Sequence, residues 1–157
     1  MPVNPKTVQG RRELTFQSLQ DVLADVERLV ASPSTRTLGN WSLAELLNHL
    51  TMTMNNSIDG FQLKAPFIIR LLGPFFKKTA LKKISPGIKL PKAAEAAAYP
   101  PSTSLQQSLQ DFRRAIQRTM MEDMEAAHPA FGRMNNEEWT QLHLRHSEMH
   151  LSFAVPE

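Results

Sequence analysis

Four separated stretches of the chain carry apolar residues at every third or fourth position, which is the spacing of an amphipathic helix. They cover residues 11–31, 42–61, 102–127 and 135–154. No stretch alternates apolar and polar residues as a half-buried strand does, and no internal repeat is present. Because each stretch has one apolar side, the stretches must bury those sides against one another. The sequence therefore predicts an all-α protein folded as a four-helix bundle.

The ends of these helices have recognisable signals. Ser42 with Glu45 has the spacing of a capping box, in which two side chains bond each other's backbone N–H groups, and the run N-N-E-E that starts at Asn135 has the same spacing. The third helix is expected to stop before His128, because the residue that precedes a proline avoids helical geometry.

The connection between the second and third helices, residues 64–101, contains six prolines. We expect one or two short helices around residues 67–84, followed by an extended arm stiffened by proline. Residues 60–94 hold eight basic residues and no acidic one, whereas the rest of the chain holds ten basic and fifteen acidic residues. The net charge of +3 thus comes from this long basic crossover.

The composition favours one compact domain that spans residues 1–157. Apolar residues make up 41% and charged residues 21%, as in ordinary globular proteins. There is no cysteine, so that any nucleophilic sulfur must come from a bound small molecule. The N-terminus does not have the pattern of a secretory signal, and the longest apolar segment is too short to cross a bilayer. These features predict a cytoplasmic protein without a transmembrane segment.

Three of the five histidines, His143, His146 and His150, lie on the same side of the last predicted helix as Trp139 and Phe153. A buried imidazole needs partners for both ring nitrogens, and three in one stripe are hard to satisfy with backbone groups alone. His146 and His150 are one helical turn apart, so that their side chains can reach one metal ion. Two packed histidines bonded to carbonyl groups or water are the alternative.

A third ligand must come from another helix, and His49 is the candidate. On a helical wheel it lies about 100° from the centre of the leucine stripe of its helix, at the border of the buried face. A helix with two neighbours in a bundle can still turn that border inward. His128 precedes a proline in a predicted loop and is expected at a helix end or on the surface.

This arrangement resembles the DinB/YfiT-like metalloprotein superfamily, which has one histidine in its second helix and an H-x-x-x-H pair in its last. The 27 residues from His128 to Ala154 carry the motif, with Asn136 as an exception, and read HPAFGRMNNEEWTQLHLRHSEMHLSFA. They are similar to an uncharacterised bacterial branch with an "hP-x-F-G" loop, an acidic-Trp helix start and an H-x-x-(H)H-L motif. Met149 departs from this branch, where the position is frequently a further histidine.

The resemblance implies a DinB-like bundle in which His49, His146 and His150 bind one divalent metal ion, with zinc or nickel as the leading candidates. His143 falls outside this triad and is expected either to pack in the core or to orient one of the metal-binding histidines without touching the metal. Characterised relatives use their metal to activate a low-molecular-weight thiol for transfer or isomerisation, and others have no known activity. The superfamily's name implies no polymerase activity.

Two functional hypotheses follow. The first is a metal-dependent, thiol-dependent transferase or hydrolase that acts on an unknown small molecule. The basic crossover would then hold an anionic group through its four central lysines, Lys77, Lys78, Lys82 and Lys83; a solvated basic face is the alternative. The second is a non-catalytic protein whose residues 64–84 lie on an anionic membrane surface or partner. No motif points to nucleic acid as a partner, and a homodimer is left open.

Overall fold

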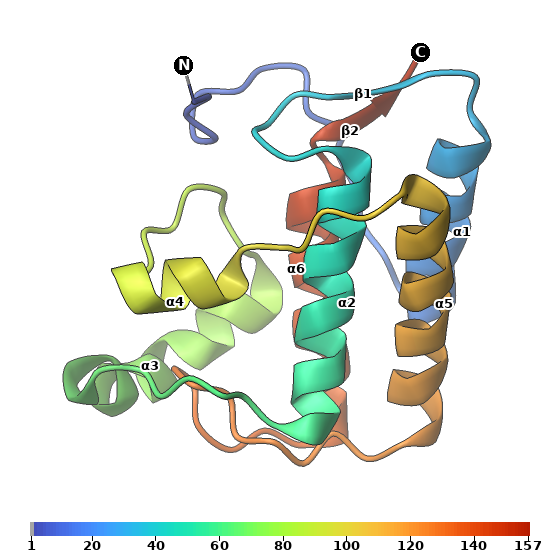
Figure 1. The fold of residues 1–157 in the computed structure, drawn as a ribbon. Coiled ribbons are helices and arrows are strands. Elements are labelled where there is room, and N and C mark those ends of the chain that lie inside the picture. The colour runs from blue at the N-terminus through green and yellow to red at the C-terminus, as the bar shows by residue number, and fades with distance from the viewer. Residues whose placement is uncertain (1) are drawn as a thin grey trace.

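The computed structural model describes residues 2–157, which form six helices and two short strands (Figure 1). The helices are α1 (Leu19–Ala31), α2 (Leu43–Asp59), α3 (Phe67–Lys82), α4 (Lys92–Ala98), α5 (Leu105–Met121) and α6 (Asn136–Leu151). The strands are β1 (Thr35–Thr37) and β2 (Ala154–Pro156).

Helices α1, α2, α5 and α6 form the predicted bundle. Both α1 and α2 contact α5 and α6, so that the four helices enclose one main core (Figure 1). The largest fully buried side chains of this core are Phe112, Leu47, Leu50, Met54, Leu151, Val22 and Val26. The all-α bundle with a long connection between its second and third helices is therefore confirmed. Helix α6 also contacts α3, so that it is covered on more than one side.

The predicted capping boxes at Ser42 and Asn135 are both present. The first helix was expected to start at residue 11, and this start is wrong. Helix α1 begins after Ser18, which forms a capping box of its own with Asp21. The preceding residues are held in a non-helical path by long-range bonds. Arg12 makes an ion pair with the buried carboxylate of Asp25, with N–O distances of 2.9 and 2.7 Å.

The two strands were not predicted. β1 and β2 pair antiparallel, with Thr35 opposite Pro156, and tie the C-terminus to the loop between α1 and α2. Three residues per strand are too few to produce an alternating pattern in the sequence. The last helix was expected to reach Ala154, but Ser152 caps it and the chain turns into β2.

The crossover is more helical than predicted. One or two short helices were expected around residues 67–84, and the segment forms one longer helix, α3, of 16 residues that contains Pro74. Proline has no N–H group to donate to the carbonyl group four residues earlier in the helix. Pro74 is exposed, so that water can bond to that carbonyl group instead. The expected extended arm contains α4, whose sequence KAAEAAA is rich in the strongest helix former. No helix within residues 2–157 has the length and apolar content of a membrane span.

α3 lies beside the bundle and is docked on α6 and on the loop before it (Figure 1). Gly73 approaches this loop so closely that a Cβ atom would overlap the carbonyl oxygen of Ala130. Nearby, Lys77 Nζ lies 2.7 Å from Glu138 Oε1 at the start of α6. A second apolar cluster under α3 contains Met124, Met134, Trp139 and Leu142, with Ile58, Phe61, Ala80, Leu81, Ile84 and Phe131 packed against it.

Gly73→Ala tests this docking. Alanine in place of glycine normally stabilises a helix interior by about 1 kcal/mol. Here we expect the opposite local effect, because the added methyl group displaces α3 from the Ala130 loop. Amide hydrogen exchange in residues 67–82 should become faster in the variant while exchange in α2 stays unchanged. Thr79→Ala, an exposed change in the same helix, is the control, and equal behaviour of the two variants would contradict the contact.

Candidate metal centre

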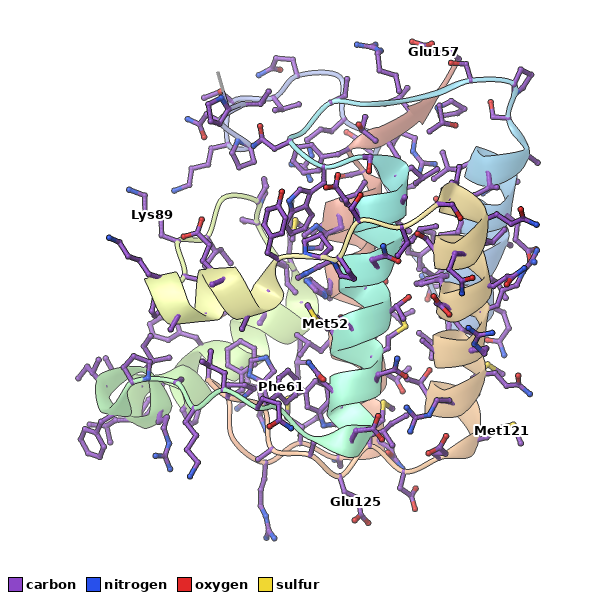
Figure 2. All side chains as sticks on the ribbon, viewed as in Figure 1. Met52, Phe61, Lys89, Met121, Glu125 and Glu157 are labelled. Atoms are coloured by element: carbon purple, nitrogen blue, oxygen red, sulfur yellow. The ribbon has the colours of Figure 1, made fainter. Side chains whose placement is uncertain are left out.

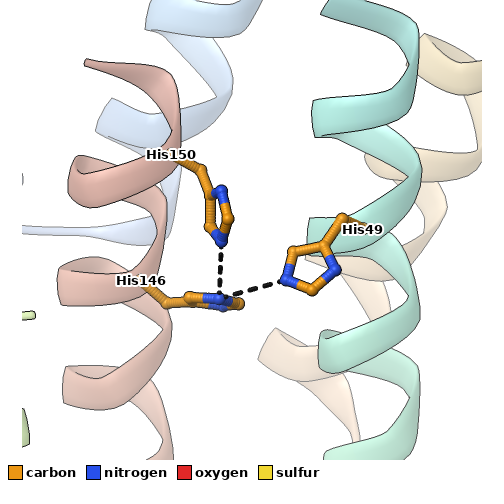
Figure 3. Close-up of side chains that lie close together, drawn as sticks. All are labelled: His49, His146 and His150. Atoms are coloured by element: carbon orange, nitrogen blue, oxygen red, sulfur yellow. Dashed lines mark hydrogen bonds between the residues drawn. The ribbon is translucent and has the colours of Figure 1, made fainter. Parts of the chain in front are cut away.

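His49, His146 and His150 meet at one point between α2 and α6 (Figure 3). The Nε2 atom of His146 lies 3.2 Å from Nε2 of His49 and 3.0 Å from Nε2 of His150. One nitrogen of each ring lies within 4.8 Å of the other two. The structure therefore brings together the three residues that the sequence singled out.

Two neighbouring helices produce this convergence. His146 and His150 are successive turns of α6, while His49 comes from the middle of α2, which packs between α5 and α6. The leucine stripe of α2 faces the main core, and its border turns toward α6. The side chain of His49 is consequently buried, with only 5% of the residue exposed.

The hydrogen bond between His49 and Ala98 fixes the protonation of the His49 ring. Nδ1 of His49 lies 2.8 Å from the carbonyl oxygen of Ala98, at the end of α4. A carbonyl oxygen only accepts, so Nδ1 must carry the proton and donate it. In the neutral ring Nε2 is then unprotonated, and its lone pair points at His146. An outer hydrogen bond of this kind orients metal-binding histidines in proteins.

The ring of His146 cannot satisfy both of its neighbours with protons alone. Its Nε2 is within hydrogen-bond distance of two other ring nitrogens, and a neutral imidazole has a single N–H group. That group can donate to one neighbour only. A cation between the three rings removes the conflict, because every nitrogen then offers a lone pair. The arrangement of donors thus fits a metal ion better than it fits three packed imidazoles.

The surroundings keep the three rings uncharged. Burial lowers the pKa of His49, although the bond to Ala98 opposes this effect. Burial also holds the pKa values of His146 and His150 well below their usual range, and the neighbouring histidines lower them further. The Arg11 guanidinium adds to the effect at His150. Neutral imidazole is the form that binds metals, so the site is prepared for a cation at neutral pH.

A cavity of about 1000 Å³ opens onto the triad. Its wall includes the end of the crossover, from Ile84 to Tyr99, and part of the N-terminal segment around Lys6. Trp41 is stacked on His150, with ring centroids 5.5 Å apart and an angle of 15° between the planes. His146 and His150 line the cavity and are partly exposed, so a small molecule can reach their rings.

Sequence reasoning missed Trp41, Tyr99 and the carbonyl group of Ala98. Trp41 lies directly before the N-cap of α2, where an apolar residue often packs against the fourth residue of the helix. That residue is Leu46, and both side chains line the cavity. This position was therefore a usable signal for Trp41. No local pattern marks Ala98. Its carbonyl group accepts the His49 N–H only because the crossover returns to α2 at this residue.

The four lysines that were expected to hold an anionic group lie elsewhere. Lys77 is half-buried and paired with Glu138, and the exposed Lys78, Lys82 and Lys83 are not among the residues that line the cavity within the described chain. The cations in the cavity wall are Lys6 and Lys89, and the wall also contains the acidic side chain of Glu95. An anion-binding role of the four lysines stays a prediction.

The remaining two histidines are both bonded within the protein. The hydroxyl of Ser57 donates to the carbonyl oxygen of Met54 at 2.6 Å, so it accepts the Nε2–H of His143 at 3.0 Å. The ring of His143 also stacks on Trp139. These contacts give it a packing role, and its support of a metal ligand stays a prediction.

His128 is more enclosed than the expected surface position. Its Nδ1 accepts the backbone N–H groups of Ala130 and Phe131, both at 3.1 Å, and its ring stacks on Phe131. It thereby shapes the loop on which Gly73 of α3 is docked. Burial lowers the pKa of His128 from 6.5 to about 4.

The distances within the triad match a small divalent ion. Two nitrogens bound to one tetrahedral zinc ion at about 2.0–2.1 Å lie about 3.3 Å apart. The two closest pairs here are 3.0 and 3.2 Å apart. Three neutral imidazoles are a donor set suited to zinc, nickel or copper. The cluster can therefore hold a metal ion.

Fold and site together define the class of this chain as an all-helical protein with a histidine cluster capable of metal binding. Residues 8–157 match the model of a family described as "Protein of unknown function (DUF1569)". Since the match covers nearly the whole chain, the protein belongs to this family. No curated protein and no solved structure matches the chain.

Acid should weaken the fold through His128. In the unfolded chain its pKa returns to 6.5, so that below this pH the unfolded state takes up a proton that the folded state refuses down to about pH 4. The free energy of unfolding should therefore fall as the pH drops from 6.5 to about 4. Urea unfolding at several pH values measures this fall. His128→Asn keeps a side-chain acceptor for the loop and should show a smaller fall; an equal fall in both proteins would contradict the assignment.

Proposed function

We propose that this protein is a metal-dependent enzyme in which His49, His146 and His150 bind one divalent ion, zinc or nickel. The observation that carries the proposal is the bond from His49 Nδ1 to Ala98, which leaves the Nε2 lone pair aimed at the ring of His146. A structural site would close four protein ligands around the ion, whereas three ligands leave one position free. The free position suits catalysis.

The cavity beside the triad supports a catalytic role. The three histidines would hold the ion, and their rings lie at the cavity that Trp41 and the crossover line. A divalent ion held there would act as a Lewis acid on a ligand from the cavity. The chain's own residues would orient that ligand: Trp41 offers a flat apolar wall, and Lys6 and Lys89 offer positive charge for an anionic group.

We further propose that the bundle is a member of the DinB/YfiT-like superfamily and that its ligand is a low-molecular-weight thiol. Supporting features are the order of the helices, the triad drawn from the second and last bundle helices, and the absence of any cysteine in the chain. With no sulfur nucleophile of its own, the protein would use a borrowed one in a transferase or hydrolase reaction.

Metal content tests the site directly. Protein purified without immobilised-metal chromatography should contain about one divalent ion per chain, measured by elemental analysis, and His49→Ala, His146→Ala and His150→Ala should each lose it. A hundredfold excess of free ion over its Kd should stabilise the folded protein by about 2.7 kcal/mol. This corresponds to a rise in Tm of about 5–10 °C for a chain of this size.

His128→Asn is the matched control, because it removes a half-buried histidine that lies outside the triad. It should keep the metal and the rise in Tm. Retention of the full metal content by all three triad variants, or the absence of metal binding by wild-type protein after incubation with zinc and nickel, would refute the proposed site.

Turnover separates an enzyme from a metal-binding scaffold. The metal-loaded protein should consume glutathione or another small thiol in the presence of electrophilic acceptors, followed as loss of free thiol. Chelation and His146→Ala should abolish this consumption. Trp41→Leu keeps the three ligands and should raise KM, since it removes one wall of the cavity. Full metal occupancy without turnover of any thiol or ester tested would support the metal site and refute the proposed enzymatic activity.

A further inference from the structure

We infer that the outer face of α3 is a docking surface for an anionic lipid membrane. This α3 surface consists of the exposed side chains Phe67, Ile68, Leu71, Leu72, Phe75 and Phe76, together with the lysines Lys78, Lys82 and Lys83. It lies outside the bundle and contains none of the three histidines of the metal centre.

The apolar part of the α3 surface is unusually exposed. Phe75 is 79% exposed, Phe67 76% and Phe76 61%. Six of the twelve large apolar side chains that are exposed in the described chain belong to this one helix. Single exposed apolar residues need no explanation, but a contiguous patch of this kind marks an interaction site.

The exposure follows from how α3 is docked. Gly73 and the half-buried Ile69, Lys77, Ala80 and Leu81 form the side of the helix that faces the bundle. The phenylalanines and leucines of its first half point the other way. Folding therefore leaves these side chains in water although the protein has a complete core without them.

The charges around the patch select an anionic surface. Lys78 and Lys82 lie in the second half of α3 and Lys83 directly follows it. All three are exposed, and none has an ion pair within the described residues. No acidic residue occurs between Gly60 and Ala94. An amphipathic helix of this kind lies in a membrane interface, with apolar side chains among the acyl chains and lysines at the headgroups. Each lysine near an anionic leaflet adds attraction.

A second copy of the chain fits the α3 surface less well. Two-fold contact through the same patch would bury the lysines of both copies, with no acidic residue in the segment to neutralise them. An acidic protein would satisfy the lysines, but within the described chain the exposed apolar side chains of α3 are not among the residues that line the two cavities. A fluid anionic lipid surface can take up the apolar side chains among its acyl chains and bind the lysines at its headgroups.

Vesicle sedimentation of the full chain tests the inference. The protein should bind vesicles of phosphatidylcholine with 30% phosphatidylglycerol, and bind pure phosphatidylcholine at least about tenfold more weakly. Salt at about 0.5 M should release it, because surface attraction is screened. Changing Lys78, Lys82 and Lys83 to Gln should lower the partition coefficient on anionic vesicles by about 100-fold. Changing Phe67, Phe75 and Phe76 to Ser should lower it at least as much.

Matched controls come from the opposite side of the molecule. Arg36, Arg113 and Arg114 changed together to Gln remove the same number of positive charges from exposed ion pairs on β1 and α5. Met121→Ser removes an apolar side chain that is 76% exposed and lies far from α3 (Figure 2). Both controls should bind vesicles as the wild-type protein does. Metal content, measured in all variants, should not change.

Three results would overturn the inference. One is the absence of binding to anionic vesicles, or equal binding to both kinds of vesicle. Another is a homodimer in analytical ultracentrifugation that the phenylalanine variant disrupts, which would make the patch a contact between copies. The last is binding to polyglutamate without binding to vesicles, which would indicate an acidic protein partner. Because none of these readouts involves the metal, failure here and failure of the proposed enzyme are distinguishable.

Discussion

The bond between His49 and the carbonyl group of Ala98 is the interaction on which the geometry of the triad depends. It joins the middle of α2 to the end of the crossover, two segments 49 residues apart. At the same time it determines which nitrogen of His49 faces α6. Without this partner the ring could hold its proton on either nitrogen, and a donor set of three lone pairs would not be fixed. The position of the crossover and the chemistry of the triad are therefore linked.

The crossover itself has two different halves. Its first half, α3, is docked away from the triad on the loop shaped by His128 and leaves an apolar face in solvent. Its second half, from Ile84 to Tyr99, returns across the mouth of the cavity and ends at α2. Residues 83–91 connect the two halves without a helix. The wall of the cavity and the apolar face of α3 thus belong to one continuous segment of the chain.

Features encoded within one or two helical turns were predictable from the sequence. The spacing of His146 and His150, the capping boxes at Ser42 and Asn135, and the helical periodicity all depend on local geometry, and the structure bears them out. Features that depend on distant contacts were not. The helix wheel left His49 at a border, and only the packing of α2 between two neighbours turns it inward. The start of α1, the pairing of β1 with β2 and the wall formed by Trp41 likewise depend on segments far apart in the chain.

The glycine at position 73 limits how α3 can rearrange. A helix held only by side-chain packing can shift along its axis or rotate, since neighbouring side chains adjust to one another. Here the backbone of α3 abuts the backbone of the Ala130 loop, and the adjacent positions carry Leu72 and Pro74. Neither a one-residue translation nor a rotation by one position keeps a residue without Cβ at this point. The absence of a Cβ atom at Gly73 thus fixes the orientation of α3 on the loop. A large movement of α3 is then a hinge motion of the whole helix together with its loop.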